Sequence, residues 1–365
     1  MLSLPHRLRY LLAWDHRLCR AVLGVFIRAL LDFYRHQGRQ YGVNDGHTGT
    51  LTVIQRFGGG LNLNIHFHTL ALDGVFSEEA TGGLRFHPAL PPSDAEVARL
   101  LTIIRARVRR LLRRRGLASQ EDVIPPDPLA EESLALAGIS AASILGRIAL
   151  GRRAGARVWR LGHDPEAVWV ASTGPRQAHL EGFDLHANVW VPATNRARLE
   201  ELCRYLLRPP VAQDRLRLTG DGRIRLRLKT PWADGTRHLL FEPLEFLEKL
   251  AALIPRSHVN LVLYHGVLAS HARWRSRVVL PEPTDPATGG LRDSLDPADG
   301  SPPTPRSRHW AWAQLMQRAF GVDVLGCPRC AGRLRLVATV DDPYAIRAIL
   351  ESLGLPADVP QPDPP

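Results

Sequence analysis

The segment from Asn64 to Leu72 constrains the fold of this chain more than any other. It reads Asn-Ile-His-Phe-His-Thr-Leu-Ala-Leu, so apolar and polar side chains alternate along much of it. In an extended strand, residues two apart project from the same face. His66 and His68 therefore share one face, while Ile65 and Phe67 point to the other. The pattern predicts a β-strand whose apolar face covers a core and whose second face carries two imidazoles.

Turn signals bound this strand on both sides, and the sequence before it offers a partner. Gly58-Gly59-Gly60 precedes the strand and Asp73-Gly74 follows it directly. Thr50–Phe57 also alternates, which predicts an antiparallel pair. Two imidazoles on one face can bind a single divalent metal ion. The chain has 15 histidines, however, so two half-buried histidines without a ligand are the alternative.

Arginine dominates the basic side chains. Lys229 and Lys249 are the only lysines among 47 basic residues, and the formal net charge is +11. The planar guanidinium group binds phosphate oxygens and stacks on bases, so this excess of arginine favours a nucleic-acid partner. A genome rich in G and C, which inflates arginine codons whatever the function, is the alternative. At 365 residues, 45% of them hydrophobic, the chain has room for two or three domains.

Several classes of protein are disfavoured by what the sequence lacks. Four scattered cysteines are too few for a disulfide framework. No apolar run approaches the roughly 18 residues of a membrane span, and the first residues do not resemble a signal peptide. We therefore expect a cytoplasmic protein with no membrane partner, and the arginine excess makes DNA its expected partner.

Residues 8–38 and 94–115 carry helical periodicity. Seven arginines are spread around the second of these helices and cannot all be buried, so the helix either contacts DNA or is a solvated surface helix. Residues 129–150 are a further helical stretch, and 186–191 alternate like a second core strand. The candidate DNA-binding residues are Arg56, Arg105, Arg109, Arg113 and Arg208.

A helix opened by Thr194 or Asn195 and ended by Pro209-Pro210 carries Tyr205 beside its apolar stripe. A hairpin around Asp221-Gly222 and a helix over residues 243–253 follow. A tyrosine on a rigid helix can cleave a phosphodiester if the phenol lies in line with the phosphorus and a metal ion polarises the phosphate. A tyrosine at the edge of the core is the alternative reading.

Two imidazoles leave most of the coordination sphere of a divalent ion open. Gln55, on the preceding strand, is the first candidate for a third ligand, and Glu201 and Asp73 come after it. Magnesium and manganese both accept such oxygen ligands, so both remain open as the cofactor.

Composition divides the chain into three parts. We expect a catalytic domain over residues 1–280 with a helical insertion at about 92–165, a disordered linker over 281–306 and a small module over 307–358. The module contains Cys327 and Cys330 in Cys-x-x-Cys spacing, which is half of a zinc site. Reduced thiols at a turn are the alternative.

These residues resemble a known family, the rolling-circle transposases of the insertion sequence ninety-one and ISCR type, which are histidine-hydrophobic-histidine (HUH) nucleases. The resemblance implies an α+β fold with an antiparallel-sheet HUH-nuclease core, nicking of single-stranded element ends, a covalent 5′-phosphotyrosine and strand transfer to a target. It also implies that His66 and His68 bind the metal and that Tyr205 is the nucleophile. The matching segments are Gln55-Arg56-Phe57-Gly58, Leu61–His68, Leu72–Val75, Leu202–Pro210, Leu228–Trp232, Tyr264–Val267 and Cys327-Pro328-Arg329-Cys330.

The chain departs from the family at two places. Members with two catalytic tyrosines place them four residues apart, but Glu201 stands here, so the chain resembles the single-tyrosine branch. Relatives usually begin with a cysteine-rich zinc-binding segment, which we expect this copy to lack. The alternatives are a cupin-like metal enzyme, of which only the first half-pattern is present, and an inactive DNA-binding relic of a transposase. A histidine-triad hydrolase is disfavoured because Leu70 occupies the place of the third histidine.

Overall fold

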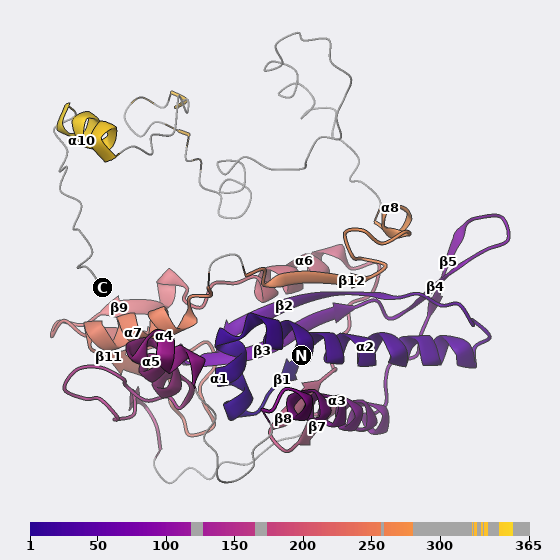
Figure 1. Ribbon diagram of the computed structural model, residues 1–365, viewed down its shortest axis with the longest axis horizontal. Helices are drawn as coiled ribbons and strands as arrows, with labels where there is room; N and C mark the ends of the chain where they lie inside the picture. Colours follow the sequence, from indigo (N-terminus) through magenta and orange to yellow (C-terminus); the bar gives the residue numbers. More distant parts are fainter. Residues whose placement is uncertain are drawn as a thin grey trace. The chain divides into compact units, whose positions relative to one another are not determined.

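The chain divides into two compact units, Met1–Pro283 and Thr284–Pro365. The computed structural model describes residues 1–117, 127–164, 174–256 and 259–279 of the first unit (Figure 1), and in the second unit residues 323, 325–326, 330, 332–334 and 343–352. Helix α10 (Pro343–Ser352) belongs to the second unit. The expected linker at 281–306 lies outside the described residues, as does most of the expected module at 307–358.

A six-stranded sheet forms the centre of the first unit. Every neighbouring pair in it is antiparallel, and with the flanking helices it gives the α+β class expected from the sequence. The strand order brings together segments from both ends of the unit. It runs β12 (Val262–Gly266), β2 (Gly49–Phe57), β3 (Leu63–Ala71), β1 (Leu2–Ser3), β8 (Phe183–His186) and β7 (Gln177–Leu180).

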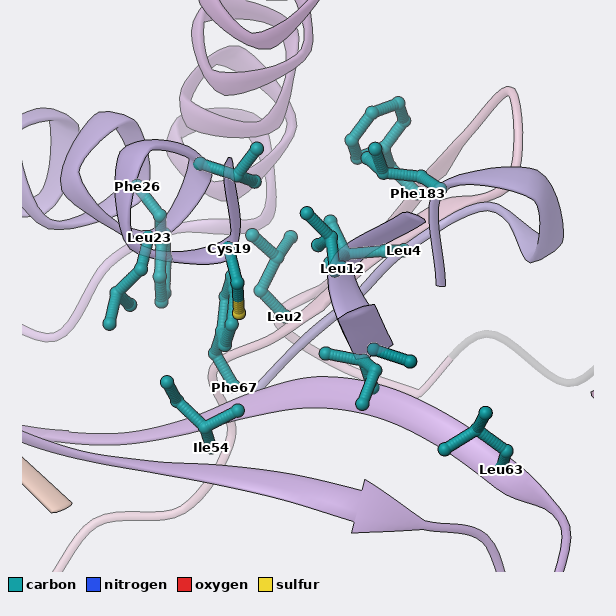
Figure 2. Packing of buried hydrophobic residues seen from close by; sticks show 14 of the residues in the cluster. Leu2, Leu4, Leu12, Cys19, Leu23, Phe26, Ile54, Leu63, Phe67 and Phe183 are labelled. Carbon is teal, nitrogen blue, oxygen red and sulfur yellow. The ribbon is translucent and has the colours of Figure 1, made fainter. Parts of the chain in front are cut away.

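Helices α1 (His6–Trp14) and α2 (His16–Gln40) cover one face of this sheet. Phe26 of α2 stacks on Phe67 of β3 with ring centroids 6.4 Å apart, and both side chains are almost wholly buried. Figure 2 shows Phe67 and Ile54 of the sheet meeting the apolar side chains of the helices. The alternation around the histidines therefore places the apolar set in the core, as the period of two requires.

The sequence predicted one helix over residues 8–38, but the structure has two. Asp15 separates them, and its side chain accepts a hydrogen bond from the backbone N–H of Leu18. Aspartate at such an N-cap satisfies one of the unpaired N–H groups at the start of a helix. The apolar period continues through the break, which is why periodicity alone did not reveal it.

Helix α3 (Asp94–Arg114) matches the predicted arginine-rich helix and packs on α2 and β7. A capping box between Ser93 and Glu96 fixes its first turn. Its buried stripe consists of aliphatic residues such as Ile104 and Val108, so its arginines lie around the remaining surface.

A second, four-stranded antiparallel sheet lies in the same unit. Helix α7 packs on it through Phe246, which contacts Phe241 with ring centroids 6.0 Å apart, and α5 packs on α7. The segment expected as a helical insertion supplies α3, α4 and α5, but also a strand of this sheet. The elements are β6 (Trp159–Leu161), β11 (His238–Phe241), β10 (Ile224–Arg227) and β9 (Leu216–Leu218), with α4 (Pro128–Glu132), α5 (Leu134–Ile144) and α7 (Pro243–Leu253).

The remaining elements are short. Strands β4 (Gly74–Glu78) and β5 (Leu84–Pro88) form a hairpin, a 3₁₀ turn spans Gln213–Arg215, and α8 spans Arg275–Val278. The predicted core strand over residues 186–191 is wrong: β8 ends at His186, and Val189 and Trp190 are more than half exposed. Among the described residues, no helix has the length and apolar character to cross a membrane.

Replacing Phe67 tests the packing beneath the histidine strand. Phe67→Ala removes a fully buried ring and leaves a cavity against Phe26, so we expect the free energy of unfolding to fall by about 3–5 kcal/mol. Phe86→Ala is the matched control, because Phe86 is a strand phenylalanine that is 36% exposed, and we expect a loss under about 1 kcal/mol. Urea denaturation measures both, and equal losses would contradict this account of the core.

Candidate active site

His66 and His68 lie on the sheet face opposite α1 and α2. In the register of β2 with β3, Gln55 pairs with His66 and Val53 pairs with His68. The Nε2 atoms of the two histidines are 3.1 Å apart, so the two rings converge rather than diverge. The period of two along β3 produces this arrangement, because it sends both imidazoles to the same side.

The orientation of His66 is fixed by the backbone. Its Nδ1–H donates to the carbonyl of Asn64 at 2.8 Å, so the lone pair of the neutral ring is on Nε2, the atom that faces His68. The register of β2 and β3 shifts by one between Gln55 and Phe57, so β3 carries an extra residue beside this point. Such bulges commonly redirect side chains next to active sites.

Both imidazoles are neutral at ordinary pH. Burial lowers the pKa of His66 below its usual value, and burial together with the neighbouring His66 lowers the pKa of His68 to about 3. A neutral imidazole keeps the lone pair that a metal ion needs. The environment therefore prepares both histidines as ligands rather than as proton donors.

Helix α6 (Arg196–Leu206) carries Tyr205 across the histidine face. Asn195 caps the helix by accepting from the N–H of Arg198, as the sequence predicted. Figure 1 shows α6 and α2 on opposite sides of β2 and β3. The rings of His68 and Tyr205 lie edge to face with centroids 6.1 Å apart. Residues from two distant halves of the chain thus meet at one place.

One buried hydrogen bond ties the strand to the helix. The side-chain amide nitrogen of Gln55 donates to the carbonyl of Leu206 at 2.9 Å, and Gln55 is almost fully buried. Leu206 follows Tyr205 directly, so this bond fixes the last turn of α6 over the histidines. The amide nitrogen is occupied there, which leaves Oε1 as the atom of Gln55 that could bind a metal.

Two cations lie against the Tyr205 ring. The Lys229 ammonium is 4.5 Å and the Arg208 guanidinium 4.4 Å from its centroid, and Tyr205 is 36% exposed. Sequence reasoning did not single out Lys229. The signal was available, because this chain uses arginine almost everywhere else and retains lysine at only two positions.

The donor atoms fit a divalent ion. Two nitrogens 3.1 Å apart that each bind one ion at about 2.1 Å subtend roughly a right angle, as neighbouring ligands of an octahedral ion do. The Oδ1 atom of Asn64, two residues before His66, is also buried and has no hydrogen-bond partner. Within the described part of the chain, no cluster of three or more His, Cys, Asp or Glu side chains could hold a metal ion. The donor atoms available to a metal ion at this site are therefore imidazole nitrogens and amide oxygens.

The other two candidate ligands are placed differently. Asp73 accepts a hydrogen bond from the indole nitrogen of Trp190 at 2.8 Å. Glu201 is exposed on α6, one helical turn before Tyr205. Residues four apart on a helix lie on the same face, so Glu201 shares a helix face with the phenol.

Arg56 is not a surface residue, which corrects its proposed contact with DNA. Its guanidinium is buried and donates to the carbonyls of Leu253 and Ala13 at 3.0 Å each. Nη2 reaches two further carbonyls, those of Ala252 and Ile254. Arg56 therefore joins α1, β2 and the end of α7, and its hydrogen-bonding groups face the protein interior.

The remaining arginine candidates differ in exposure. Arg105 and Arg109 on α3 both pair with Glu181, and Arg113 is exposed near the end of the same helix. Arg208 is the candidate that reaches the histidine and tyrosine site. The Nε atoms of Arg105 and Arg208 are buried without a partner.

The proposed zinc pair is only half described. Cys330 is an exposed free cysteine, whereas Cys327 lies outside the described residues. The zinc interpretation therefore stays a prediction.

Comparison with known proteins gives one family. A family model described as "Putative transposase" matches residues 49–276, a span that includes both histidines, Tyr205 and Lys229. The match covers more than half of the chain, so the chain belongs to this transposase family. No curated protein and no solved structure matches it.

Arg56→Gln separates a structural role for Arg56 from DNA binding. Loss of the guanidinium leaves buried carbonyls unpaired, so we expect the free energy of unfolding to fall by about 2–4 kcal/mol. The exposed Arg20 is the control, and Arg20→Gln should change stability by no more than about 0.5 kcal/mol. Chemical denaturation gives both values. A stable Arg56→Gln protein with weakened DNA binding would reverse the assignment.

Proposed function

We propose that this transposase cuts single-stranded DNA at the ends of a mobile element with Tyr205 as nucleophile, in rolling-circle transposition of the HUH, insertion sequence ninety-one type. The observation that carries the proposal is the 6.1 Å approach of the Tyr205 ring to His68, whose Nε2 faces that of His66. A phenol from the second half of the unit would have no reason to lie here if the histidines were an isolated structural pair.

The reaction requires one bond to form and one to break. The phenol of Tyr205 loses its proton as its oxygen attacks the phosphorus, the bond from phosphorus to the 3′ oxygen breaks, and the leaving 3′ oxygen takes up a proton in turn. The products are a 5′-phosphotyrosine and a free 3′-hydroxyl. Attack by a target 3′-hydroxyl on the same phosphorus then transfers the strand and restores the phenol. In-line geometry is the main requirement, and a helix packed on a sheet provides a rigid mount.

Lys229 and Arg208 would bind the scissile phosphate. Both cations already contact the Tyr205 ring, so a phosphate near the phenolic oxygen would lie within their reach. Negative charge grows on the phosphoryl oxygens and on the leaving oxygen during transfer, and preorganised cations stabilise it. Arg113 on α3 would extend the DNA contact away from the site, together with Arg105 and Arg109 if DNA displaces their shared partner Glu181.

His66, His68 and the Oε1 atom of Gln55 are the residues we assign to magnesium or manganese. Such an ion, when bound, polarises the non-bridging phosphate oxygens. The protein's part is to keep both imidazoles neutral and convergent, which burial and the Asn64 carbonyl accomplish. We also retain zinc at Cys327 and Cys330 as a proposal for the second unit.

Glu201 limits each active site to one covalent adduct at a time. The position one turn before Tyr205 holds a carboxylate, which cannot form a stable phosphotyrosine-like link. One active site therefore makes one adduct at a time. Cutting both element ends then requires either two successive cycles or two copies of the chain.

Tyr205→Phe tests the nucleophile. We expect the covalent adduct with labelled single-stranded oligonucleotides to disappear, while oligonucleotide affinity changes less than about threefold, because the ring and its cation contacts remain. Tyr264→Phe is the matched control: Tyr264 is 47% exposed on β12 and also has an arginine against its ring. Denaturing gels measure the adduct.

The outcomes separate the rival functions. If the Tyr205→Phe variant still forms the covalent adduct, the proposed mechanism is wrong. An unmodified chain that binds DNA but forms no adduct with magnesium or manganese would be the inactive relic. Tight metal binding without any DNA dependence would instead favour the cupin-like enzyme.

Titration calorimetry with manganese tests the metal ligands directly. We expect His66→Ala and His68→Ala each to weaken manganese binding by about tenfold or more, because each removes one of the few ligands. His265→Ala is the control, since His265 is a half-buried histidine of the neighbouring strand β12 outside this pair. Unchanged affinity in both test variants would exclude the pair as the metal site.

A further inference from the structure

The four-stranded sheet has one covered face and one open face. The buried side chains of Leu226, Leu239 and Phe241 share the face on which α7 packs. Residues one position away along each strand point to the opposite side. On that side the register aligns Arg225 with Arg217 and with Leu240.

Arginine dominates the open face. Arg217, Arg225 and Arg227 are exposed and lie on the two adjacent strands β9 and β10. Arg217 and Arg225 stand directly opposite each other, and like charges at such positions destabilise a sheet. Folding therefore does not account for this pair. A polyanion lying across the strands would relieve the repulsion.

Protein carboxylates neutralise this face only in part: Arg223 pairs with Glu242 and Asp221. The side chain of Arg225 has neither an ion pair nor a hydrogen bond among the described residues, and that of Arg217 donates to a backbone carbonyl, that of Leu216. Arg227 pairs with Asp214 at 3.5 Å, but both side chains are more than half exposed. Surface pairs of this kind contribute little and exchange readily for another anion.

The face favours a duplex backbone over unpaired bases. Sheets that bind single strands present aromatic rings on which bases stack. Here the aromatic residue is Trp159 on β6, and its ring already contacts the guanidinium groups of Arg153 and Arg223, at 3.3 and 4.6 Å from the centroid. With that ring occupied, what the face offers is guanidinium, which can bind the phosphate groups that a duplex presents on its outside.

This face leads directly to the active site. Strand β10 ends at Arg227, Leu228 is buried, and Lys229 lies on the Tyr205 ring. Two residues of chain span at most about 7 Å, so the Cα atom of Arg227 lies within that distance of the Cα atom of Lys229. A duplex on the arginine face would place its adjoining strand near Tyr205.

We propose that Arg217, Arg225 and Arg227 bind the phosphate backbone of duplex DNA beside the strand that is cut. The location of the cut strand rests on the proposed function, but duplex binding by this face does not. The face would thus be a second DNA site, separate from Lys229 and Arg208, to which we assign the scissile phosphate.

The triple variant Arg217→Gln, Arg225→Gln, Arg227→Gln tests the proposal in the full chain. Its control is Arg17→Gln, Arg20→Gln, Arg28→Gln, which removes three exposed arginines of α2 and the same total charge. The probes are a blunt duplex of defined sequence and one of its strands alone, titrated at several salt concentrations. We expect at least a tenfold loss of duplex affinity in the test variant. The slope of log affinity against log salt should fall by about 0.9 for each phosphate that the variant no longer neutralises.

Three outcomes would overturn the proposal: unchanged duplex affinity, an equal loss in the control variant, or a loss confined to the single strand. Thermal unfolding of the variants checks folding. If the triple variant does not fold, Arg225→Gln alone must still weaken duplex binding about threefold or more, because the described residues include no partner for Arg225 whose removal could disturb the fold.

Two further measurements separate this inference from the proposed function. Tyr205→Phe should keep full duplex affinity, and the triple variant should still form the covalent adduct with a short single strand that has no duplex. If Tyr205→Phe loses the adduct but the triple variant binds duplex normally, the proposed nucleophile is supported and the duplex site is contradicted. If Tyr205→Phe keeps the adduct but the triple variant loses duplex affinity, the duplex site is supported and the proposed nucleophile is contradicted.

Discussion

The contact between Gln55 and the carbonyl of Leu206 is the interaction on which the candidate site depends. It joins the strand paired with the histidines to the helix that carries Tyr205, across 151 residues of chain. The bond is buried, so an alternative partner for either group would require water to enter the interior. Without it, the last turn of α6 has no polar anchor on the sheet, and the distance between phenol and imidazole would no longer be fixed.

The charges in contact with the Tyr205 ring are positive, and the nearest carboxylate on its helix face is Glu201, one turn away. Both imidazoles are neutral because burial lowers their pKa values, while Arg208 and Lys229 bring positive charge to the phenol. Neutral imidazoles do not repel a phosphate group, and the two cations attract it even when no metal ion is bound. This distribution agrees with the transposase family to which the chain belongs, and it leaves the negative charge of the reaction to be supplied by the DNA.

Local patterns predicted the elements but not the contacts between them. The histidine strand, the Asn195 cap and the helix over residues 243–253 follow from period and capping, which act within a few residues. The burial of Arg56 could not be predicted, because its partners are carbonyls up to 198 residues away. Lys229 was missed although the rarity of lysine in this chain marks it, because its contact with the Tyr205 ring depends on the fold. The strand predicted at 186–191 failed because alternation also occurs in loops that no neighbouring strand pairs with.

The chain's use of only two lysines has a practical consequence. The ammonium of Lys249 is buried, where it donates to the carbonyl of Arg147 and pairs with Glu248. Lys229 is exposed and lies on the Tyr205 ring. Amine-selective reagents would thus modify one side chain of this protein in preference to all others. That side chain lies on the ring of the proposed nucleophile, so a fluorophore or cross-linker could be installed at the candidate site without engineering a cysteine.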